Sequence, residues 1–281
     1  MDYDFKDKTV IITGGSEGVG AATARMFARL GANLVLVARS KRNLEKIAEE
    51  LRSMTRVEIC AMDVADLDAC VNIYKKAEFE FGSVDILINN AGYHERGPVE
   101  SVSADDLSAM IDVNLKAPIL LCKLAIKHMK DAGSGAIINV GSLAGRTPVP
   151  GAATYSATKF GLRAFTFALG EEIRDSGIKL AVVSPGTIMT GFITSNFDAV
   201  SDLNFSQPIV TAEEVAQEIV NLVTNNQRER ALPRVSGYLT TISYLFPWLW
   251  RLLLPLLIRK GRRVKRQLKA QMRQAEEEQG T

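Results

Sequence analysis

Six short apolar runs recur along this chain and alternate with stretches of helical periodicity, and this alternation limits the fold more than any other feature. The runs occupy residues 8–12, 33–37, 57–61, 84–88, 136–140 and 179–184. Strands that alternate with helices predict a parallel sheet that helices cover on both faces. At 281 residues the chain is long enough for one α/β domain with a large core and an appendage. We therefore predict a doubly wound α/β domain over residues 1–232 and a separate C-terminal segment over residues 233–281.

The first apolar run leads into a glycine-rich turn, Thr13-Gly14-Gly15-Ser16-Glu17-Gly18-Val19-Gly20, which a helical pattern follows. This order aims backbone N–H groups and the positive end of a helix at a pyrophosphate. Gly14 allows the tight turn, Gly18 lets the backbone approach the phosphates, and Gly20 lets the helix pack on the strand. A plain turn between strand and helix is the alternative, but the strand before it and the helix after it favour a dinucleotide site.

The end of the second strand indicates which dinucleotide binds. An acidic residue there would accept a hydrogen bond from the ribose 2′-hydroxyl and repel a 2′-phosphate, but this chain has Ala38 and Arg39. The planar guanidinium of Arg39 is suited to pair with a phosphate. In the alternative, Arg39 is simply solvated at the end of the strand. Lys41 and Arg42 are further candidates for the phosphate-binding role, and Glu17 in the glycine turn argues against a 2′-phosphate. The sequence predicts NADP(H) as the preferred cofactor, with NAD(H) as the alternative.

One pair of residues indicates proton transfer. Tyr155 and Lys159 stand four positions apart, which places both on one face of a helix. A phenol has an ordinary pKa of about 10, and an ammonium beside it favours the phenolate. The pair therefore predicts a general acid or base with its electrostatic partner. A solvated helix face gives the same spacing by chance. The pair therefore indicates a catalytic site only together with other motifs in the chain.

Four residue sets follow one another along the chain: Thr13-Gly14-x-x-x-Gly18-x-Gly20, Asn89-Asn90-Ala91-Gly92, Ser142 and Tyr155-x-x-x-Lys159. Their order and spacing resemble the short-chain dehydrogenase/reductase superfamily over about residues 5–230. The resemblance implies a Rossmann-type fold and an enzyme that passes a hydride between a nicotinamide and a carbonyl or hydroxyl group. In such enzymes the cofactor carries the redox chemistry.

The resemblance also assigns roles to single residues. It implies that Tyr155 protonates the substrate oxygen during reduction, while Lys159 lowers the pKa of Tyr155 and holds the nicotinamide ribose. It implies that Ser142 hydrogen-bonds the carbonyl and that Asn114 orients a water in the proton relay. The cofactor contacts that it implies, besides Tyr155 and Lys159, are Thr13, Gly14, Ser16, Gly18, Val19, Gly20, Arg39, Ser40, Asp63, Val64, Asn90, Ala91, Gly92, Pro185, Gly186, Thr187 and Thr190.

Ordinary structural roles also explain the polar members of this set when each is taken alone. Ser142 then caps a turn, Asn114 bonds within a helix, and Asn89-Asn90 forms a turn.

The cysteines, Cys60, Cys70 and Cys122, lack metal-ligand spacing and predict buried reduced thiols, so we expect no metal site. The first residues contain no apolar targeting stretch, and we expect no secretory signal peptide.

The C-terminal part departs from this pattern. Residues 238–258 form an apolar and aromatic run that only Pro247, Arg251 and Pro255 interrupt. Residues 251–281 contain 9 basic and 3 acidic side chains, so a basic tail follows an acidic domain although the net charge of the chain is only +2. The combination of an apolar run and a cationic cluster favours lipid over nucleic acid as the partner of residues 238–273.

Three structures are compatible with this tail. A buried helix would place Arg251 and two tryptophans in a core. A spanning helix of about 20 residues is long enough, but Arg251 would cost about 3 kcal/mol near the bilayer centre. An interfacial anchor fits best, because prolines split the run, tryptophans favour the headgroup level and cations meet anionic lipid. We therefore predict a membrane-associated protein whose catalytic domain lies on the cytoplasmic side.

Membrane attachment favours a substrate that is poorly soluble in water. The segment after Gly186 supplies apolar side chains that either line a hydrophobic pocket or pack between helices. These are Ile188, Met189, Phe192, Ile193, Phe197 and Phe205. The segment Tyr93-His94-Glu95-Arg96-Gly97 lies near the expected mouth of the site and is interpreted as a loop, with substrate specificity as the alternative.

Membrane-associated members of the superfamily act on steroids, retinoids, long-chain acyl lipids and 3-ketosphinganine, and this chain is similar to them in its Thr-Gly-Gly-Ser turn, Ala38-Arg39 and apolar tail. The leading hypothesis is an NADP(H)-dependent oxidoreductase of lipid metabolism that acts on a lipophilic carbonyl or alcohol. One alternative is a membrane-tethered cofactor-binding scaffold or sensor with an idle site. Another is a reductase of small polar carbonyls that uses its tail for oligomer contacts. Family members commonly build dimers from the helical surfaces before Tyr155, so a homodimer or homotetramer is expected.

Overall fold

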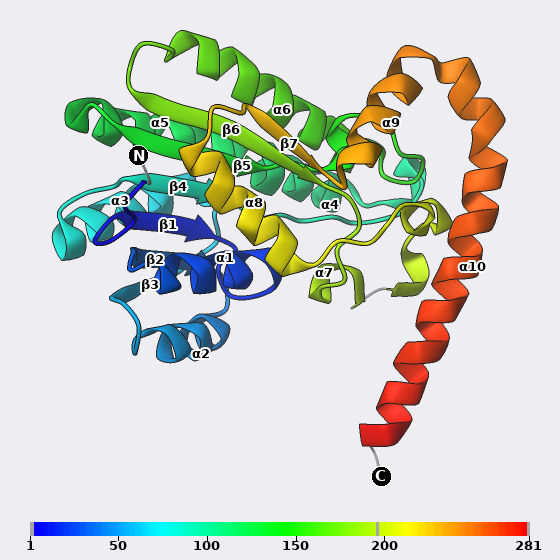
Figure 1. Cartoon of the computed structure of the whole chain (residues 1–281), viewed down its shortest axis with the longest axis horizontal. Helices are drawn as coiled ribbons and strands as arrows, with labels where there is room; N and C mark the ends of the chain where they lie inside the picture. Colours follow the sequence, from blue (N-terminus) through cyan, green and yellow to red (C-terminus); the bar gives the residue numbers. More distant parts are fainter. Residues whose placement is uncertain (1–2, 195–196, 280–281) are drawn as a thin grey trace.

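A seven-stranded parallel sheet forms the centre of the protein (Figure 1). The computed structural model describes residues 3–194 and 197–279; residues 1–2, 195–196 and 280–281 of the two predicted segments lie outside the described part. The strand order is β3-β2-β1-β4-β5-β6-β7. The strands are β1 (Thr9–Thr13), β2 (Asn33–Ala38), β3 (Val57–Ala61), β4 (Ile86–Asn89), β5 (Gly135–Val140), β6 (Ile178–Pro185) and β7 (Glu229–Leu232). The order reverses between β1 and β4, which is where open α/β sheets bind ligands.

Helices cover both faces of the sheet, which confirms the predicted Rossmann-type doubly wound fold. One face packs against α1 (Gly18–Arg29), α2 (Lys41–Leu51) and α8 (Ala212–Thr224). The other face packs against α3 (Leu67–Phe81), α5 (Ala117–Ala132) and α6 (Ala153–Glu172). Neighbouring strand residues alternate between these two cores, as strand geometry requires. In β1, for example, Val10 and Ile12 enter one core while Ile11 enters the other.

The seventh strand has no counterpart among the predicted runs. β7 pairs in parallel with β6 at the edge of the sheet, with Glu229 opposite Val182 and Leu232 opposite Pro185. It is only four residues long, and its sequence, Glu-Arg-Ala-Leu, is not continuously apolar. Edge strands tolerate such polar residues because one side of the strand is not covered by a neighbour.

The C-terminal appendage consists of two helices, α9 (Arg234–Leu245) and α10 (Pro247–Gln279). In Figure 1, α10 runs down one side of the molecule, next to the segment that contains α7 (Gly191–Thr194), and ends at the C-terminus. Gly261 marks a very close approach, because a Cβ atom there would lie 1.8 Å from the carbonyl oxygen of Asp202. The predicted helical appendage is therefore present, and it lies against the α/β domain.

Both apolar and charged contacts fasten α10 to the domain. Val264, Leu268 and Met272 of α10 pack on a small core formed by Ile193, Phe197, Val200 and Phe205. Arg262 pairs with Asp202 at 2.9 Å, and Lys269 pairs with Asp198 at 2.6 Å. The Lys265 ammonium donates to the backbone carbonyls of Asp198 and Val200. Three basic residues that were expected to meet lipid thus contact the acidic residues and backbone of their own chain.

These contacts bear on the predicted spanning and anchoring of the tail. No helix within residues 3–194 and 197–279 is both long enough and apolar enough to cross a bilayer. In α10 the apolar stretch gives way to Arg259 and Lys260, and its later apolar side chains are used for packing on the domain. The cysteines were predicted to be buried thiols; Cys70 and Cys122 are buried, whereas Cys60 is half-buried.

Candidate active site

A large cavity of about 1060 Å³ lies at the C-terminal ends of the central strands. Most of the residues predicted for the site line this cavity, and they come from the ends of six different strands and from helices α1 and α6. The lining members are Gly14, Ser16, Gly18, Val19, Arg39, Ser40, Asp63, Val64, Asn90, Ala91, Gly92, Ser142, Tyr155, Lys159, Pro185, Gly186, Thr187 and Thr190. Thr13, Gly20 and Asn114 are not part of the lining; they support it from behind.

The glycine-rich turn forms a cradle that only glycines fit. Gly14 and Gly18 adopt positive φ angles of 65° and 53°, a region that side chains disfavour. A Cβ atom on Gly20 would lie 2.0 Å from the carbonyl oxygen of Gly14, so any side chain there would separate α1 from the strand. The N-cap residue of α1, Glu17, makes no side-chain capping bond. The backbone N–H groups at this helix end are thus available to a phosphate, and the residues present fit a dinucleotide.

Thr13 and Asn90 hold the glycine turn against the loop after β4. The Thr13 hydroxyl accepts hydrogen bonds from the backbone N–H groups of Asn90 and Ala91 at 3.0 and 3.1 Å. The Asn90 amide donates back to the carbonyl oxygens of Thr13 and Gly14 at 2.9 and 3.1 Å. These bonds join the glycine-rich turn to the loop after β4. Thr13 therefore positions two parts of the cavity wall without lining the cavity itself.

The adenosine end of the cavity contains Arg39 and Asp63. Arg39 follows β2 as an exposed side chain in the cavity wall. The next residue, Ser40, caps α2 by accepting from the backbone N–H of Asn43 at 3.2 Å, which fixes the start of the helix. Asp63 accepts from the backbone N–H of Ala65 at 2.9 Å. Arg39, Ser40 and Asp63 thus all line this end of the cavity.

Helix α6 carries the predicted acid-base pair. Lys159 is buried, at 4% exposure, and its ammonium donates to the carbonyl oxygen of Val140 at 2.9 Å. Burial lowers the pKa of Lys159 to about 8. Burial also raises the pKa of Tyr155, while a hydrogen bond with Ser142 and the positive charge of Arg96 oppose that rise. The cation that acts most clearly on the phenol in this structure is therefore Arg96, which the sequence did not assign to that role.

Ser142 follows β5 and faces Tyr155. Its hydroxyl oxygen accepts from the backbone N–H of Ala144 at 3.1 Å, which caps the short helical turn Leu143–Gly145. The capping role that was the ordinary alternative is thus present, and it leaves the hydroxyl proton to be donated elsewhere. Capping and substrate binding are compatible functions of the same side chain.

Asn114 supports the site without lining it. It lies in a π-helical turn, Asp112–Lys116, between α4 (Ala104–Ile111) and α5, a feature that often marks functional sites. Its side chain accepts from the backbone N–H of Tyr93 at 2.8 Å and donates to the Tyr93 carbonyl at 2.7 Å. A Cβ atom on Gly92 would lie 3.6 Å from Asn114 Oδ1 and 4.0 Å from Lys159 Nζ. Asn114 and Lys159 thus flank one glycine, and the relay role of Asn114 stays a prediction.

Two residues of the loop after β4 reach further into the site than the sequence indicated. The ring of His94 stacks on the ring of Tyr155, with centroids 4.1 Å apart and planes 13° apart. Burial, with the charges of Arg96 and Lys159, lowers the pKa of His94 to about 3, so the ring is neutral near pH 7. His94 and Arg96 both line the cavity. In the sequence, the only indication that these two residues belong to the site was their position directly after the Asn-Ala-Gly segment.

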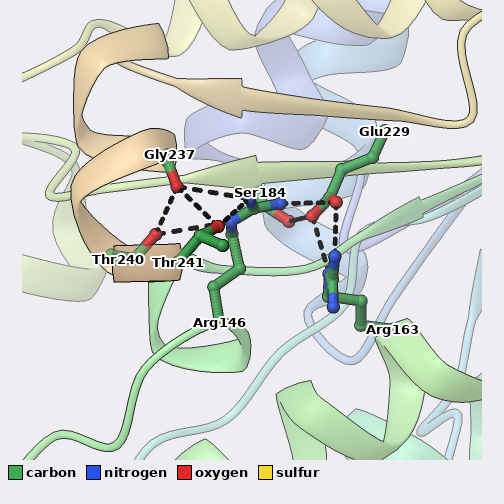
Figure 2. Close-up of polar contacts among 7 residues, drawn as sticks. All are labelled: Arg146, Arg163, Ser184, Glu229, Gly237, Thr240 and Thr241. Carbon is green, nitrogen blue, oxygen red and sulfur yellow. Dashed lines mark hydrogen bonds and ion pairs between the residues drawn. The ribbon is translucent and has the colours of Figure 1, made fainter. Parts of the chain in front are cut away.

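A partly buried carboxylate connects the segment after Ser142 with helix α6 (Figure 2). Glu229 of β7 receives a bidentate pair from Arg163 of α6 at 2.9 and 2.8 Å, and it also pairs with Arg146. Arg146 follows the Ser142 turn and donates to the Gly237 carbonyl of α9 at 3.2 Å. The network therefore joins the serine segment, the helix that carries Tyr155 and Lys159, and the C-terminal appendage. No local motif marks these residues, because they are far apart in the sequence.

The C-terminal helices also complete the cavity wall. Leu239 and Thr240 of α9 and Trp250 of α10 line the cavity. Among the apolar residues predicted to cover the substrate, Ile188 and Ile193 line the cavity. Met189, Phe197 and Phe205 belong to the small core under α10, as the packing alternative supposed. The side chain of Phe192 lies outside the described part of the structure.

Comparisons with known proteins agree with this geometry. A sequence profile of the family described as short chain dehydrogenase matches residues 8–201. An uncharacterized oxidoreductase of Staphylococcus saprophyticus is 37% identical over 84% of this chain and 90% of its own length. Sulfoacetaldehyde reductase 2 of Chromohalobacter salexigens is 34% identical over 76% of this chain and 88% of its own length.

Solved structures show the same architecture. The crystal structure of a metagenomic short-chain oxidoreductase in complex with NADP has a TM-score of 0.71 and 29% identity, and the match covers 82% of this chain and 98% of that one. A putative short-chain alcohol dehydrogenase from Sinorhizobium meliloti has a TM-score of 0.75 and 28% identity, over 84% and 98% of the two chains. Both matches extend over nearly the whole of the other protein.

The prediction of a membrane-associated protein with its catalytic domain on the cytoplasmic side is therefore wrong. The described helices include none that can cross a bilayer. The similar proteins from Staphylococcus and Chromohalobacter are oxidoreductases, and nothing in their descriptions supports the resemblance to membrane-associated members. The basic side chains that suggested lipid contact pair with Asp198 and Asp202 of the same chain.

Proposed function

The chain belongs to the short-chain dehydrogenase family, and on this premise we propose that it is an NADP(H)-dependent reductase of a small polar carbonyl compound. The observation that carries the proposal is the meeting of Ser142, Tyr155 and Lys159 in one cavity whose other end is the glycine-rich cradle. The relative named for sulfoacetaldehyde supports a small and polar substrate. The substrate end of the cavity also contains polar side chains, which are His94, Arg96, Thr147, Asn204, Gln207, Ser236 and Thr240.

The residues of the site divide the proton chemistry among them. Bound NADPH would supply the hydride that the carbonyl carbon accepts. The Ser142 hydroxyl, whose oxygen is held by the Ala144 N–H, donates to the carbonyl oxygen as negative charge develops there. Tyr155 transfers its proton to that oxygen. The positive charge of Arg96, which acts to lower the pKa of Tyr155, favours the resulting phenolate, and the Lys159 ammonium lies 5.8 Å from the centroid of the Tyr155 ring.

The choice between the two cofactors follows from the adenosine end of the cavity. Arg39 is suited to the 2′-phosphate of NADP(H) because its planar fork can form two parallel hydrogen bonds with a phosphate. The structurally similar metagenomic oxidoreductase was solved with NADP. NAD(H) lacks that phosphate, so we propose that it serves less well.

A second candidate keeps the chemistry and changes the substrate. A lipophilic ketone or alcohol, such as a long-chain keto-lipid, steroid or retinoid, is favoured by the apolar part of the cavity wall. That wall consists of Leu143, Val149, Ile193, Leu203, Leu239 and Trp250. The two C-terminal helices supply the last two of these, so the tail would shape the pocket for either substrate class.

The test is NADPH oxidation, followed at the nicotinamide absorbance, with sulfoacetaldehyde, small aldehydes, and long-chain and steroidal ketones. We expect turnover of a small polar carbonyl, a higher kcat/KM with NADPH than with NADH, and loss of at least about 100-fold in kcat in Tyr155→Phe. NADPH binding by that variant, measured by fluorescence, controls for folding. Turnover confined to the lipophilic ketones would favour the second candidate. Tight NADPH binding without any turnover would favour the scaffold or sensor with an idle site.

Self-association as a homodimer or homotetramer stays a prediction. The C-terminal helices supply exposed apolar side chains for the oligomer contacts that were expected of the tail. They are Tyr238, Leu239, Ile242, Tyr244, Leu245, Phe246, Trp248, Leu252, Leu253 and Leu256.

A further inference from the structure

Arg96 places a permanent charge at the substrate end of the cavity. It lies on the loop between β4 and α4, and its side chain lines the same cavity as Tyr155 and Ser142. The side chain is half-buried and its Nε atom is shielded from solvent. A guanidinium keeps its charge under such conditions, because its ordinary pKa lies above 12. The loop thus introduces a fixed positive charge next to the reacting groups.

The charges along the cavity wall differ from one end to the other. The cations in the wall are Arg39 at the adenosine end, Lys159 at the centre and Arg96 at the substrate end. The carboxylates in the wall are Glu17, Asp63, Asp106 and Asp112. Asp106 accepts hydrogen bonds from the hydroxyls of Tyr93 and Ser103, both at 2.6 Å, and Asp112 pairs with Lys116 at 2.8 Å. The nearby His94 ring adds no second charge, because burial, with the charges of Arg96 and Lys159, keeps its pKa at about 3.

Glu95 is the carboxylate that faces Arg96 most directly. Burial lowers the pKa of Arg96, and the charges of Tyr155 and Glu95 oppose this shift only in part. Glu95 accepts a long hydrogen bond of 3.4 Å from the Tyr93 hydroxyl, and it is not part of the cavity wall, whereas Arg96 is. The positive charge is therefore presented to the cavity, and the negative charge of its sequence neighbour is not.

We propose that Arg96 binds an anionic group of the substrate, so that the site accepts small carbonyl compounds that carry a carboxylate or a sulfonate a few bonds from the carbonyl. The inference rests on the proposed function, because it names the substrate class of the same site. Arginine suits this role because its planar fork forms two parallel hydrogen bonds with such a group. In the partly desolvated cavity each of these bonds is stronger than in water.

The experiment compares two substrates that differ in one charge, 4-oxobutanoate and its methyl ester. The enzyme with NADPH should reduce the anion with at least about tenfold higher kcat/KM, and in Arg96→Gln the ratio of the two values should fall about 10- to 100-fold. Arg96→Lys should retain part of the ratio. Arg29→Gln is the control: it removes an exposed arginine at the end of α1, outside the cavity wall, and the ratio should stay as in the wild type.

Binding provides a readout that does not depend on turnover. Butanoate and propane-1-sulfonate should inhibit competitively against the carbonyl substrate, butanamide should inhibit at least about tenfold more weakly, and Arg96→Gln should remove this difference. The stronger of the two anions identifies the preferred group. Butanoate and butanamide also test the wild-type enzyme directly, which matters if Arg96→Gln does not fold.

The outcomes separate the inference from the proposed function. If both substrates are reduced with equal kcat/KM, or if the ratio survives in Arg96→Gln, the anion site is refuted while the reductase remains. The anion site is also refuted if Arg96→Gln slows both substrates equally, because Arg96 then acts only through Tyr155. If the wild type reduces neither of these compounds nor any other small polar carbonyl, the proposed function itself fails.

Discussion

Replacing Glu229 with Gln tests how the partly buried carboxylate in Figure 2 supports the site. The side chains of Glu229 and Arg146 are 13% and 14% exposed, and that of Arg163 is 31% exposed. Ser184 adds a hydrogen bond to the same carboxylate at 3.0 Å. Glutamine keeps the shape but removes the charge, so two guanidinium groups would remain largely buried beside a neutral amide.

Removing one partner of a buried ion pair costs about 3 to 5 kcal/mol. Because Arg163 is partly exposed to water, we expect the lower end for Glu229→Gln, about 3 kcal/mol of unfolding free energy. In a domain of this size that corresponds to a fall of about 6 °C in Tm. The kcat should fall as well, because the network joins the turn after Ser142 to the helix that carries Tyr155.

The dependence on pH provides a second test of the same reasoning. Burial alone would raise the pKa of Glu229, but the hydrogen bonds and charges of Arg163 and Arg146 lower it below the ordinary 4.5. A carboxyl whose folded pKa is depressed stabilises the protein above its unfolded pKa and loses this effect as pH falls through the folded value. The Tm difference between wild type and Glu229→Gln should be constant above about pH 5.5 and should shrink below about pH 4.5.

The assay is thermal unfolding by circular dichroism at several pH values, with Glu50→Gln as the matched control. Glu50 accepts the same bidentate pair from Arg25, at 2.7 and 2.8 Å, but the two side chains are 44% and 35% exposed. Surface pairs contribute less than about 1 kcal/mol, so the control should lose little. Equal losses in the two variants, or a Glu229→Gln difference that does not depend on pH, would refute the argument.

Two further predictions concern the tail and the acid-base pair. Gly261→Val should undock α10 from Asp202, lower the free energy of unfolding by about 1 to 3 kcal/mol and speed proteolytic cleavage within α10. Gly170→Ala is its control, because a Cβ there meets only a methyl group of Leu180 at 4.0 Å; equal protease resistance of the two variants would contradict the docking. Since burial places the pKa of Lys159 at about 8, reduction with NADPH should slow as pH rises through that value, and a profile of kcat/KM that stays flat to about pH 9.5 would contradict it.

The sheet could be predicted because its signals are local. In the central strands nearly every residue is apolar, since helices cover both faces, and each run ends in glycines or polar residues that break the pattern. β7 gave no such signal, because an edge strand of four residues needs neither a continuous apolar run nor alternation. Its most important side chain, Glu229, is charged, and the arginines that make its burial tolerable lie on other segments.

In the candidate site, too, some residues could be predicted from local spacing and others could not. Tyr155 and Lys159 could be paired from their spacing alone, because a helix converts four positions into one face. The stacking of His94 on Tyr155 and the approach of Arg96 depend on the path of an irregular loop, and no periodicity encodes that path. The expected influence of Lys159 on the Tyr155 pKa came from adjacency, whereas in the structure its ammonium is turned toward the Val140 carbonyl.

The tail shows why composition led to the wrong location. An apolar stretch followed by cations is typical of a membrane anchor, but the same residues also suit an intramolecular clamp if acidic partners exist. Those partners, Asp198 and Asp202, are far away in the sequence, in a segment without a motif. Gly261 permits the close approach, since a Cβ there would lie 1.8 Å from the Asp202 carbonyl. Because α10 holds the segment that contains Leu203, and both Leu203 and Trp250 of α10 line the cavity, the tail is better understood as a part of the cavity wall than as a membrane anchor.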